Sequence, residues 1–192
     1  EGYFSPQIEF VESDGDLRLT VAPGPRTVIA AVDVAVDGPV AAKTRQELIA
    51  GWELPVGQPF RQQDWNTAKQ QILSRLLAEN HAAARLVDSQ ATIDPATRQA
   101  RLMARYDSGP PFRFGELRVE GLERYPVTLV ERHNRTVRPG EPFREADLNA
   151  LQAALQATPQ FRSVQVSIDR DTPPDADGVV TAPVTVRLSE RP

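Results

Sequence analysis

The chain has 192 residues, with 22 basic and 26 acidic side chains, two histidines and no cysteine. Its net charge of −4 excludes a strongly basic nucleic-acid-binding surface over the whole chain. The lack of cysteine excludes disulfides, thiolate nucleophiles and zinc–thiolate sites. Apolar runs are only a few residues long, as in Val28–Val32, so no segment can cross a bilayer as a helix. We therefore expect one or two globular domains of ordinary composition.

The first predicted element is a β-hairpin, which a short stiff link at Gly24-Pro25 separates from the rest. Apolar residues alternate with polar ones on both sides of a polar turn at Ser13-Asp14-Gly15-Asp16: Ile8, Phe10, Leu17, Leu19 and Val21. This period of two is typical of strands with one buried face. The hairpin matches the last hairpin of the chain at a shift of 158 residues, so we expect it to be the end of a truncated unit. A start at Glu1 rather than Met is in line with a processed or excised fragment.

A complete unit follows, and it begins with a predicted strand and a predicted helix. The strand covers Val28–Val36 and ends at Gly38, where a positive φ costs glycine little. The helix covers Thr44–Trp52. We expect Leu48 and Ile49 on its inward face.

The same unit continues with a loop, a longer helix and a second hairpin. The loop Gly57-Gln58-Pro59-Phe60 uses glycine for the turn and phenylalanine to fill the core. The helix is predicted from apolar residues at i, i+3, i+7 and i+11: Trp65, Ala68, Ile72 and Leu76. We expect it to run on through His81 to Ala84. The hairpin pairs Val87–Ile93 with Ala100–Tyr106.

The last unit repeats this layout. Its strand covers Phe112–Val119 and ends at Gly121, and a helix that carries Val127 and Val130 starts near Pro126. A second helix is predicted from apolar residues at i, i+3 and i+7: Leu148, Leu151 and Leu155. The final hairpin is predicted from two alternating runs: Val164, Val166, Ile168, and then Val184, Val186, Leu188.

The two complete units are copies related by a shift of 83 residues. Gly57–Trp65 and Gly140–Leu148 share the pattern G-x-P-F-R-x-x-D followed by an apolar residue, and Ile8 matches Val166 at a shift of 158. The predicted fold class is α+β, in tandem β-α-α-β-β units whose three-stranded sheets are each covered on one face by two helices. The predicted domains are three: a truncated hairpin at 1–26 and complete units at 27–109 and 110–192.

Candidate ligand-binding and catalytic groups are few. His81 and His133 lie in polar stretches without oriented partners, so we expect both to be solvated. Asp175-Ala176-Asp177-Gly178 is similar to part of an EF-hand loop, but Pro173 and Val184 occupy positions where ligands belong. That segment is interpreted as a solvated hairpin loop.

Two carboxylate pairs at a spacing of four lie in the opening strands: Asp33/Asp37 and Glu116/Glu120. Their neighbours are the apolar core positions, so a solvent-facing stripe is favoured over a general acid/base pair. The sequence contains no G-x-S-x-G, P-loop or dinucleotide-binding motif. We expect no enzymatic activity, no cofactor and no metal site, and a small hydrolase is disfavoured.

The repeat resembles the POTRA domain, the periplasmic module of outer-membrane β-barrel assembly proteins. Besides the G-x-P-F loops, Phe112–Gly121 is similar to the opening strand of the barrel-proximal POTRA in TamA-type members of this family. Ala157–Val166 resembles the end of the second helix and the strand that follows it, and Gly2–Gln7 resembles the same junction in the preceding domain.

This resemblance implies a periplasmic chain, tethered to the bacterial outer membrane through a C-terminal β-barrel that lies outside this chain. It implies a role in the insertion or secretion of outer-membrane proteins such as autotransporters. The implied partners are a TamB-like inner-membrane protein and unfolded outer-membrane protein clients, without nucleic acid.

In the family, the first strand of each terminal hairpin is a sheet edge, which corresponds here to 86–93 and 162–168. An extended client can add to such an edge through backbone hydrogen bonds. The candidate partner-binding residues are eight: Val87, Ser89, Ala91, Ile93, Arg162, Val164, Val166 and Ile168.

Three alternatives remain open at this point. The chain could be the POTRA region of a BamA-like protein or of a two-partner secretion transporter. It could be a structural spacer between membranes that binds no client. The edges themselves could be protected, either by charged residues such as Arg162 and Arg170 or by a neighbouring unit.

Overall fold

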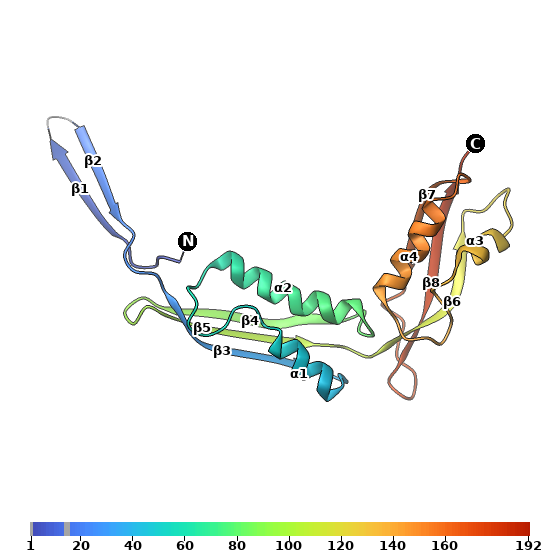
Figure 1. Ribbon diagram of the computed structural model, residues 1–192, viewed down its shortest axis with the longest axis horizontal. Coiled ribbons are helices and arrows are strands. Elements are labelled where there is room, and N and C mark those ends of the chain that lie inside the picture. The colour runs from blue at the N-terminus through green and yellow to red at the C-terminus, as the bar shows by residue number, and fades with distance from the viewer. Residues whose placement is uncertain (1, 14–15) are drawn as a thin grey trace. The chain divides into compact units, whose positions relative to one another are not determined.

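The computed structural model describes residues 2–13 and 16–192, which form two compact units (Figure 1). The first unit comprises three segments: the chain up to Asp37, Ala41–Leu73 and Leu86–Asp107. The second comprises the others: Gly38–Val40, Ser74–Arg85 and Ser108–Pro192. In chain order the elements are β1 (Gln7–Ser13), β2 (Asp16–Ala22), β3 (Val28–Asp37), α1 (Ala42–Ala50), α2 (Gln62–Ala78), β4 (Arg85–Asp94), β5 (Gln99–Asp107), β6 (Phe112–Glu120), α3 (Thr128–His133), α4 (Glu145–Gln156), β7 (Phe161–Ile168) and β8 (Val180–Glu190).

The first unit contains a three-stranded sheet in the order β3-β5-β4, in which β3 runs parallel to β5. Alternate residues of β5 are buried, so one face of the sheet belongs to the core. The helix α2 runs along the sheet (Figure 1) and buries its predicted apolar positions, of which Trp65, Ala68 and Ile72 are at most 3% exposed. The shorter α1 buries Leu48 but leaves Ile49 38% exposed. The inward prediction for Ile49 is wrong because adjacent helical positions point about 100° apart.

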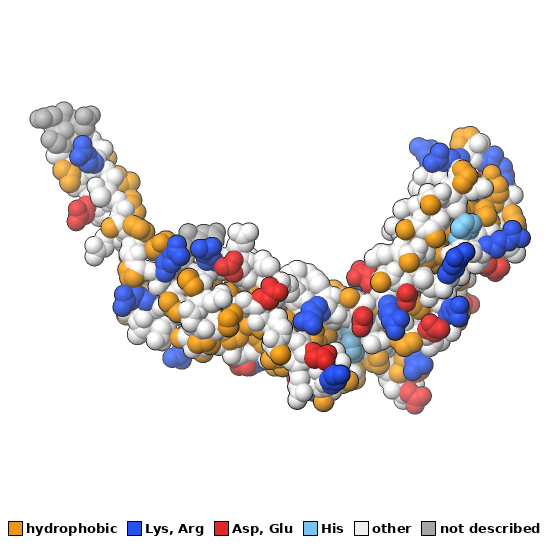
Figure 2. Space-filling view, viewed as in Figure 1, with side chains coloured by type: hydrophobic (Ala, Val, Ile, Leu, Met, Phe, Trp, Pro, Cys, Tyr) orange, Lys and Arg blue, Asp and Glu red, His pale blue; other side chains and the backbone are white. Residues whose placement is uncertain are grey.

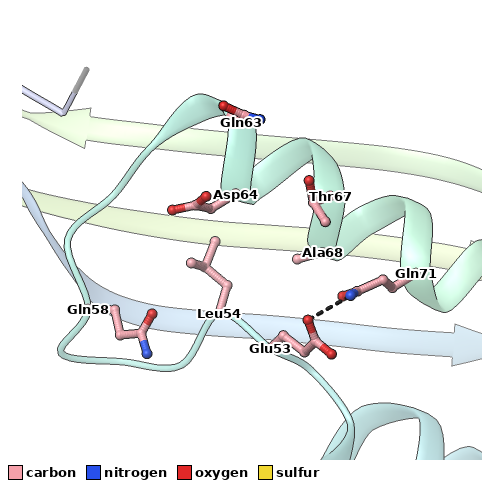
Figure 3. Close-up of a pocket in the computed structure, with 8 residues that line it drawn as sticks. All are labelled: Glu53, Leu54, Gln58, Gln63, Asp64, Thr67, Ala68 and Gln71. Atoms are coloured by element: carbon pink, nitrogen blue, oxygen red, sulfur yellow. Dashed lines mark hydrogen bonds between the residues drawn. The ribbon is translucent and has the colours of Figure 1, made fainter.

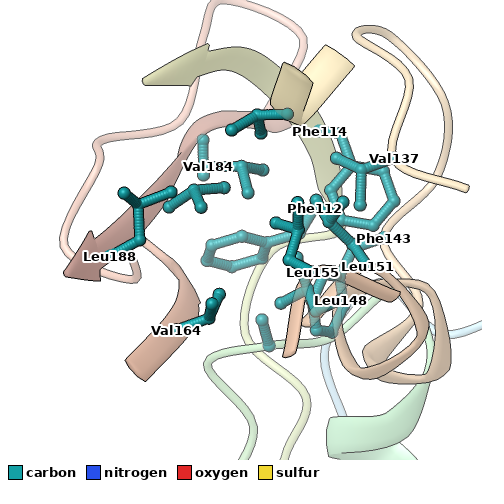
Figure 4. Close-up of a cluster of buried hydrophobic side chains, with 14 of the residues drawn as sticks. Phe112, Phe114, Val137, Phe143, Leu148, Leu151, Leu155, Val164, Val184 and Leu188 are labelled. Carbon is teal, nitrogen blue, oxygen red and sulfur yellow. The ribbon is translucent and has the colours of Figure 1, made fainter. Parts of the chain in front are cut away.

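The second unit has the sheet order β6-β8-β7, with β6 parallel and β7 antiparallel to β8. Its core, shown in Figure 4, brings together apolar side chains from both layers: Phe112, Phe114, Phe143, Leu148, Leu151, Leu155, Val164, Val184 and Leu188. The helix α3 adds the fully buried Val130. Val127, which the predicted helix included, immediately precedes α3 and is 46% exposed. Both units therefore have the predicted α+β class and β-α-α-β-β order.

The strands β1 and β2 form the predicted antiparallel hairpin, in which Ile8 lies opposite Val21 and Phe10 opposite Leu19. These four side chains are between 52% and 68% exposed, and Figure 2 shows hydrophobic side chains along this hairpin. The turn residues at 14–15 lie outside the described residues. The hairpin therefore presents an apolar face that no helix of the described chain covers.

Both G-x-P-F loops make the expected turn and fill the expected core position. Gly57 and Gly140 have φ angles of +95° and +86°, a region that glycine adopts without steric cost. Phe60 and Phe143 are each 1% exposed. The predicted roles of glycine and phenylalanine in this motif are thus confirmed.

These loops also pair with the edge of the opening strand, which the sequence did not indicate. In the second unit, the N–H of Phe114 donates to the carbonyl of Glu141, and the N–H of Phe143 donates to the carbonyl of Phe112, both at 2.9 Å. The first unit has the two equivalent bonds at 2.9 Å: Ile29 to Gln58 and Phe60 to Thr27. The repeated motif therefore closes the start of β3 and of β6 against further pairing.

The helix α2 ends at Ala78, so its expected continuation to Ala84 is wrong. Asn80 has a φ of +61°, which a continuing helix excludes. Its N–H donates to the carbonyl of Phe143 at 2.9 Å, and its own carbonyl accepts from the N–H of Phe112 at 2.6 Å. The backbone leaves the helix because these bonds to the second unit's core segments replace helical ones.

Candidate strand-addition site

The candidate site is the backbone at the outer edges of the two sheets. The strand orders place β4 and β7 at edges, as predicted. An edge strand carries unpaired N–H and C=O groups that can accept another strand. The eight candidate residues divide between these two edges: Val87, Ser89, Ala91 and Ile93 on β4, and Arg162, Val164, Val166 and Ile168 on β7.

The β7 candidates contribute most of their side chains to the core. Val164 is 6% exposed, and Val166 and Ile168 pack partly against the same apolar cluster. Arg162 is exposed because a register shift next to the buried Phe161 forms a β-bulge at this point. A partner could therefore reach β7 only through its backbone.

The β4 candidates are more accessible. Ser89, Ala91 and Ile93 are half-buried, whereas Val87 is 59% exposed. The intervening residues of this strand, including Asp88, are exposed polar ones. A strand added at β4 would thus pair with the β4 backbone and contact a surface of mixed polar and apolar side chains.

The backbone of β7 is already hydrogen-bonded at its outer edge. The side-chain amide of Gln156 donates to the carbonyl of Val164 at 3.2 Å. The N–H of Val166 donates to the side-chain oxygen of Gln152 at 2.9 Å. Both glutamines belong to α4, so side chains of this helix already bond to backbone groups in the middle of β7. Arg162 and Arg170, which the sequence suggested as residues that protect the edges, take part in neither of these two bonds.

A contact between α2 and β4 is of a different kind from the glutamine bonds to β7. Lys69 of α2 reaches the strand, but it donates to the hydroxyl of Ser89 at 3.5 Å rather than to the backbone, and it lies over the ring of Trp65 at 4.8 Å.

The opposite edge of the first sheet is interrupted. Beyond the part of β3 that the G-x-P-F loop covers, Arg105 donates to the carbonyl of Asp33 at 3.2 Å and to its carboxylate at 2.9 Å. The hydrogen bond from Arg105 lowers the pKa of Asp33. The Asp33 carboxylate is therefore charged at neutral pH, and it holds the Arg105 guanidinium beside β3.

Solved structures relate this geometry to known proteins, although no family model matches the chain. POTRA3-5 of BamA from Haemophilus influenzae superimposes with a TM-score of 0.65 at 18% identity, over 98% of this chain and 74% of that one. BamA from Haemophilus ducreyi lacking POTRA domains 1-3 gives 0.67 at 18% identity, over 85% of this chain and 29% of that one. The chain has the POTRA fold. POTRA1-2 of the periplasmic domain of Omp85 from Anabaena matches at 0.50 and 13% identity, over 88% of this chain and 98% of that one.

Three of the four carboxylates in the opening strands of the two POTRA units are exposed and paired with arginines. Besides the Asp33 pair, Glu120 accepts from Arg187 at 3.0 Å, and Glu116 forms an ion pair with Arg118. The Asp33, Glu116 and Glu120 side chains are more than half exposed. For these three, the predicted solvent-facing stripe is confirmed.

His81 is buried, so the expectation that it is solvated is wrong. It is 7% exposed, and among the described residues its Nδ1 has no hydrogen-bond partner. The sequence around it looks polar, but the backbone turn at Asn80 directs the imidazole into the second POTRA unit. Burial lowers the pKa of His81, although the carbonyls of Gly109 and Pro110 partly oppose this. His133 is only half-buried and contacts the carbonyl of Leu129 through Nδ1 at 2.8 Å.

The burial of His81 predicts a pH dependence of stability. Because its pKa is lower in the folded state, the unfolded state binds more protons, and stability is lost as the pH falls below the ordinary value of 6.5. We expect His81→Gln to reduce the change in unfolding free energy between about pH 7.5 and pH 5. Urea denaturation at both pH values measures this. An unchanged pH dependence would show that His81 does not carry it.

One pocket of about 190 Å³ lies between α2 and the segment 53–58 (Figure 3). Its polar lining includes the carboxylates of Glu53 and Asp64, and Glu53 accepts from the amide of Gln71 at 2.6 Å. The lining contains neither histidine nor lysine, which most often activate a nucleophile.

The segment 175–178 is a hairpin loop between β7 and β8. One carboxylate oxygen of Asp175 accepts from the N–H of Asp177 at 3.0 Å and from that of Val179 at 2.9 Å. The described residues contain no group of three side chains placed to hold a metal ion. They also contain no helix long and apolar enough to cross a bilayer.

Proposed function

We propose that this chain is a non-enzymatic periplasmic scaffold of an outer-membrane β-barrel assembly or secretion protein. The POTRA fold, shared with the periplasmic domain of Omp85 and with BamA, supports this. The sequence resemblance favours a TamA-type protein that assists the insertion or secretion of outer-membrane proteins such as autotransporters. Its partners would be a TamB-like protein in the inner membrane and its own C-terminal barrel in the outer membrane.

The observation that carries the proposal is the position of β4 at the edge of the first sheet. The backbone of 86–93 lies at the edge of the first sheet, and α2 packs against one face of that sheet. Backbone hydrogen bonds do not depend on the partner's sequence, so one edge can receive many different unfolded client strands. Every outer-membrane barrel is built from such strands.

Charge is expected to contribute little to this binding. Acidic and basic side chains are interspersed on the face shown in Figure 2, and the net charge is small. Long-range steering requires a large field of one sign. Binding should therefore depend weakly on salt, unlike association driven by a charged patch.

A titration with an extended peptide copied from a barrel strand tests the proposal. We expect backbone amide NMR shifts of the 192-residue chain to concentrate on 86–93, with a dissociation constant in the range of about 0.1 to 1 mM. A matched peptide with N-methylated alternate amides is the control, because it lacks donors along one edge and should bind more weakly. The absence of any shift at millimolar peptide would overturn the proposal.

Two other functions give different results in the same titration. A structural spacer between membranes would show no shift at any sheet edge. A BamA-like protein or a two-partner secretion transporter would bind at β4 as well, and only its partners in cells would distinguish it. Cross-linking of the full-length protein in cells, from the exposed Val87, identifies those partners.

A further inference from the structure

The two glutamines on α4 match the edge of β7 in spacing. Four residues of a helix rise about 6.0 Å, and two residues of a strand span about 6.6 to 6.8 Å. Gln152 and Gln156 are four apart, and their strand partners Val166 and Val164 are two apart, in the opposite direction. One helix face can therefore reach two successive outward-pointing backbone groups of β7.

Together the two side chains supply what one residue of an added strand would supply. An incoming residue of a parallel strand donates its N–H to one carbonyl and accepts from the N–H two residues further on. Gln156 is the donor to the carbonyl of Val164, and Gln152 is the acceptor from the N–H of Val166. We name Gln152 and Gln156 the glutamine cap.

The first unit carries other residues at the two cap positions although its sequence is a copy of the second. A shift of 83 residues places Lys69 at the position of Gln152 and Leu73 at that of Gln156. Lys69 bonds to the hydroxyl of Ser89, and the hydrocarbon side chain of Leu73 can form no hydrogen bond. The repeat thus keeps the fold in both units but carries this glutamine pair in only one.

We propose that the glutamine cap closes the β7 edge of this chain to an extended strand. The inference deepens the proposed function and rests on it, since the ligand is the same extended polypeptide. A client strand at β7 would first have to displace both side-chain bonds. It would gain little, because each new hydrogen bond would replace an existing one.

Removing the cap should create a second binding site. In the doubly substituted Gln152→Leu, Gln156→Leu chain, we expect the barrel-strand peptide to shift the amides of 162–168 as well as those of 86–93. Leucine is as good a helix former as glutamine, so α4 should persist. Asn149→Leu, on the exposed side of the same helix, is the control for added apolar surface and should give no shift on β7.

The outcomes separate this inference from the proposed function. Shifts on β4 alone in the doubly substituted chain would overturn the role of the cap and leave the proposed function intact. Shifts on β7 in that chain, with none on β4 in either chain, would support the cap and overturn the proposed function. Shifts on β7 in the wild type would overturn the cap directly.

Hydrogen exchange gives a second readout that needs no peptide. The single substitution Gln152→Met keeps the side-chain length but removes the acceptor of the Val166 N–H. We expect the Val166 amide to exchange about fivefold to tenfold faster, with the β8 amides unchanged. Unchanged exchange at Val166 would overturn the inference even if the doubly substituted chain failed to fold.

Discussion

Replacing Gly121 with alanine is expected to destabilise the second unit by at least about 3 kcal/mol. Gly121 has a φ of +91°, and a Cβ atom there would lie 1.9 Å from the carbonyl oxygen of Leu188. That oxygen cannot retreat, because Leu188 is 4% exposed and paired with Val164 inside the sheet. Urea denaturation followed by circular dichroism measures the loss.

Gly140→Ala is the matched control for this substitution. Gly140 has a nearly equal φ of +86°, but its Cβ would have no atom within 4 Å. It should therefore show only the cost of the left-handed backbone, about 1 to 2 kcal/mol. Equal losses for the two glycines would contradict the close approach of Gly121 to β8.

Phe143→Ala is expected to cost about 3 to 5 kcal/mol of the second unit's stability. The ring is 1% exposed and packs edge-on against Phe114 with centroids 5.8 Å apart. The same residue bonds through its backbone to Phe112 and Asn80, so a cavity here loosens the strand edge and the end of α2 together. Thermal unfolding, read by near-ultraviolet circular dichroism, measures the effect.

Two further substitutions calibrate that loss. Phe143→Leu retains most of the apolar volume and should cost clearly less than Phe143→Ala. Val127→Ala changes a side chain that is 46% exposed and should stay within about 0.5 kcal/mol of the wild type. A Phe143→Ala loss as small as that of Val127→Ala would contradict the buried position of the ring.

The repeat and its apolar periodicity were sufficient to predict the architecture. Spacings of three and four residues identified the buried faces of α2 and α4, and spacings of two identified the hairpins, because burial in these elements follows backbone geometry. The edge positions of β4 and β7 came from the family resemblance. The prediction failed at Ile49, which lies in a short helix where only a narrow stripe meets the core.

Contacts between distant segments account for what the sequence could not predict. The end of α2 and the burial of His81 depend on backbone bonds from Asn80 to residues more than thirty positions away. Glu190 is a further case. Burial would raise the pKa of its carboxyl, but backbone N–H groups of 123–125 and the Arg124 side chain outweigh this and lower the pKa to about 2.

The candidate site itself was predicted only in part. Gln152 and Gln156 look like ordinary solvated helix residues in the sequence, and their bonds to β7 depend on how α4 lies over the sheet. A comparison of the two copies contained a signal, since Lys69 and Leu73 replace them in the first unit. That difference acquires meaning only once β4 and β7 are known to be the edges.

The central claim is that an extended strand adds to β4 and not to β7. The most direct measurement uses a barrel-strand peptide with a nitroxide at one end and reads the relaxation of every backbone amide in the wild-type chain. We predict strong broadening along 86–93 that a reduced nitroxide abolishes, with the amides of 162–168 unaffected. Broadening centred on 162–168, or equal broadening at both edges, would contradict the account.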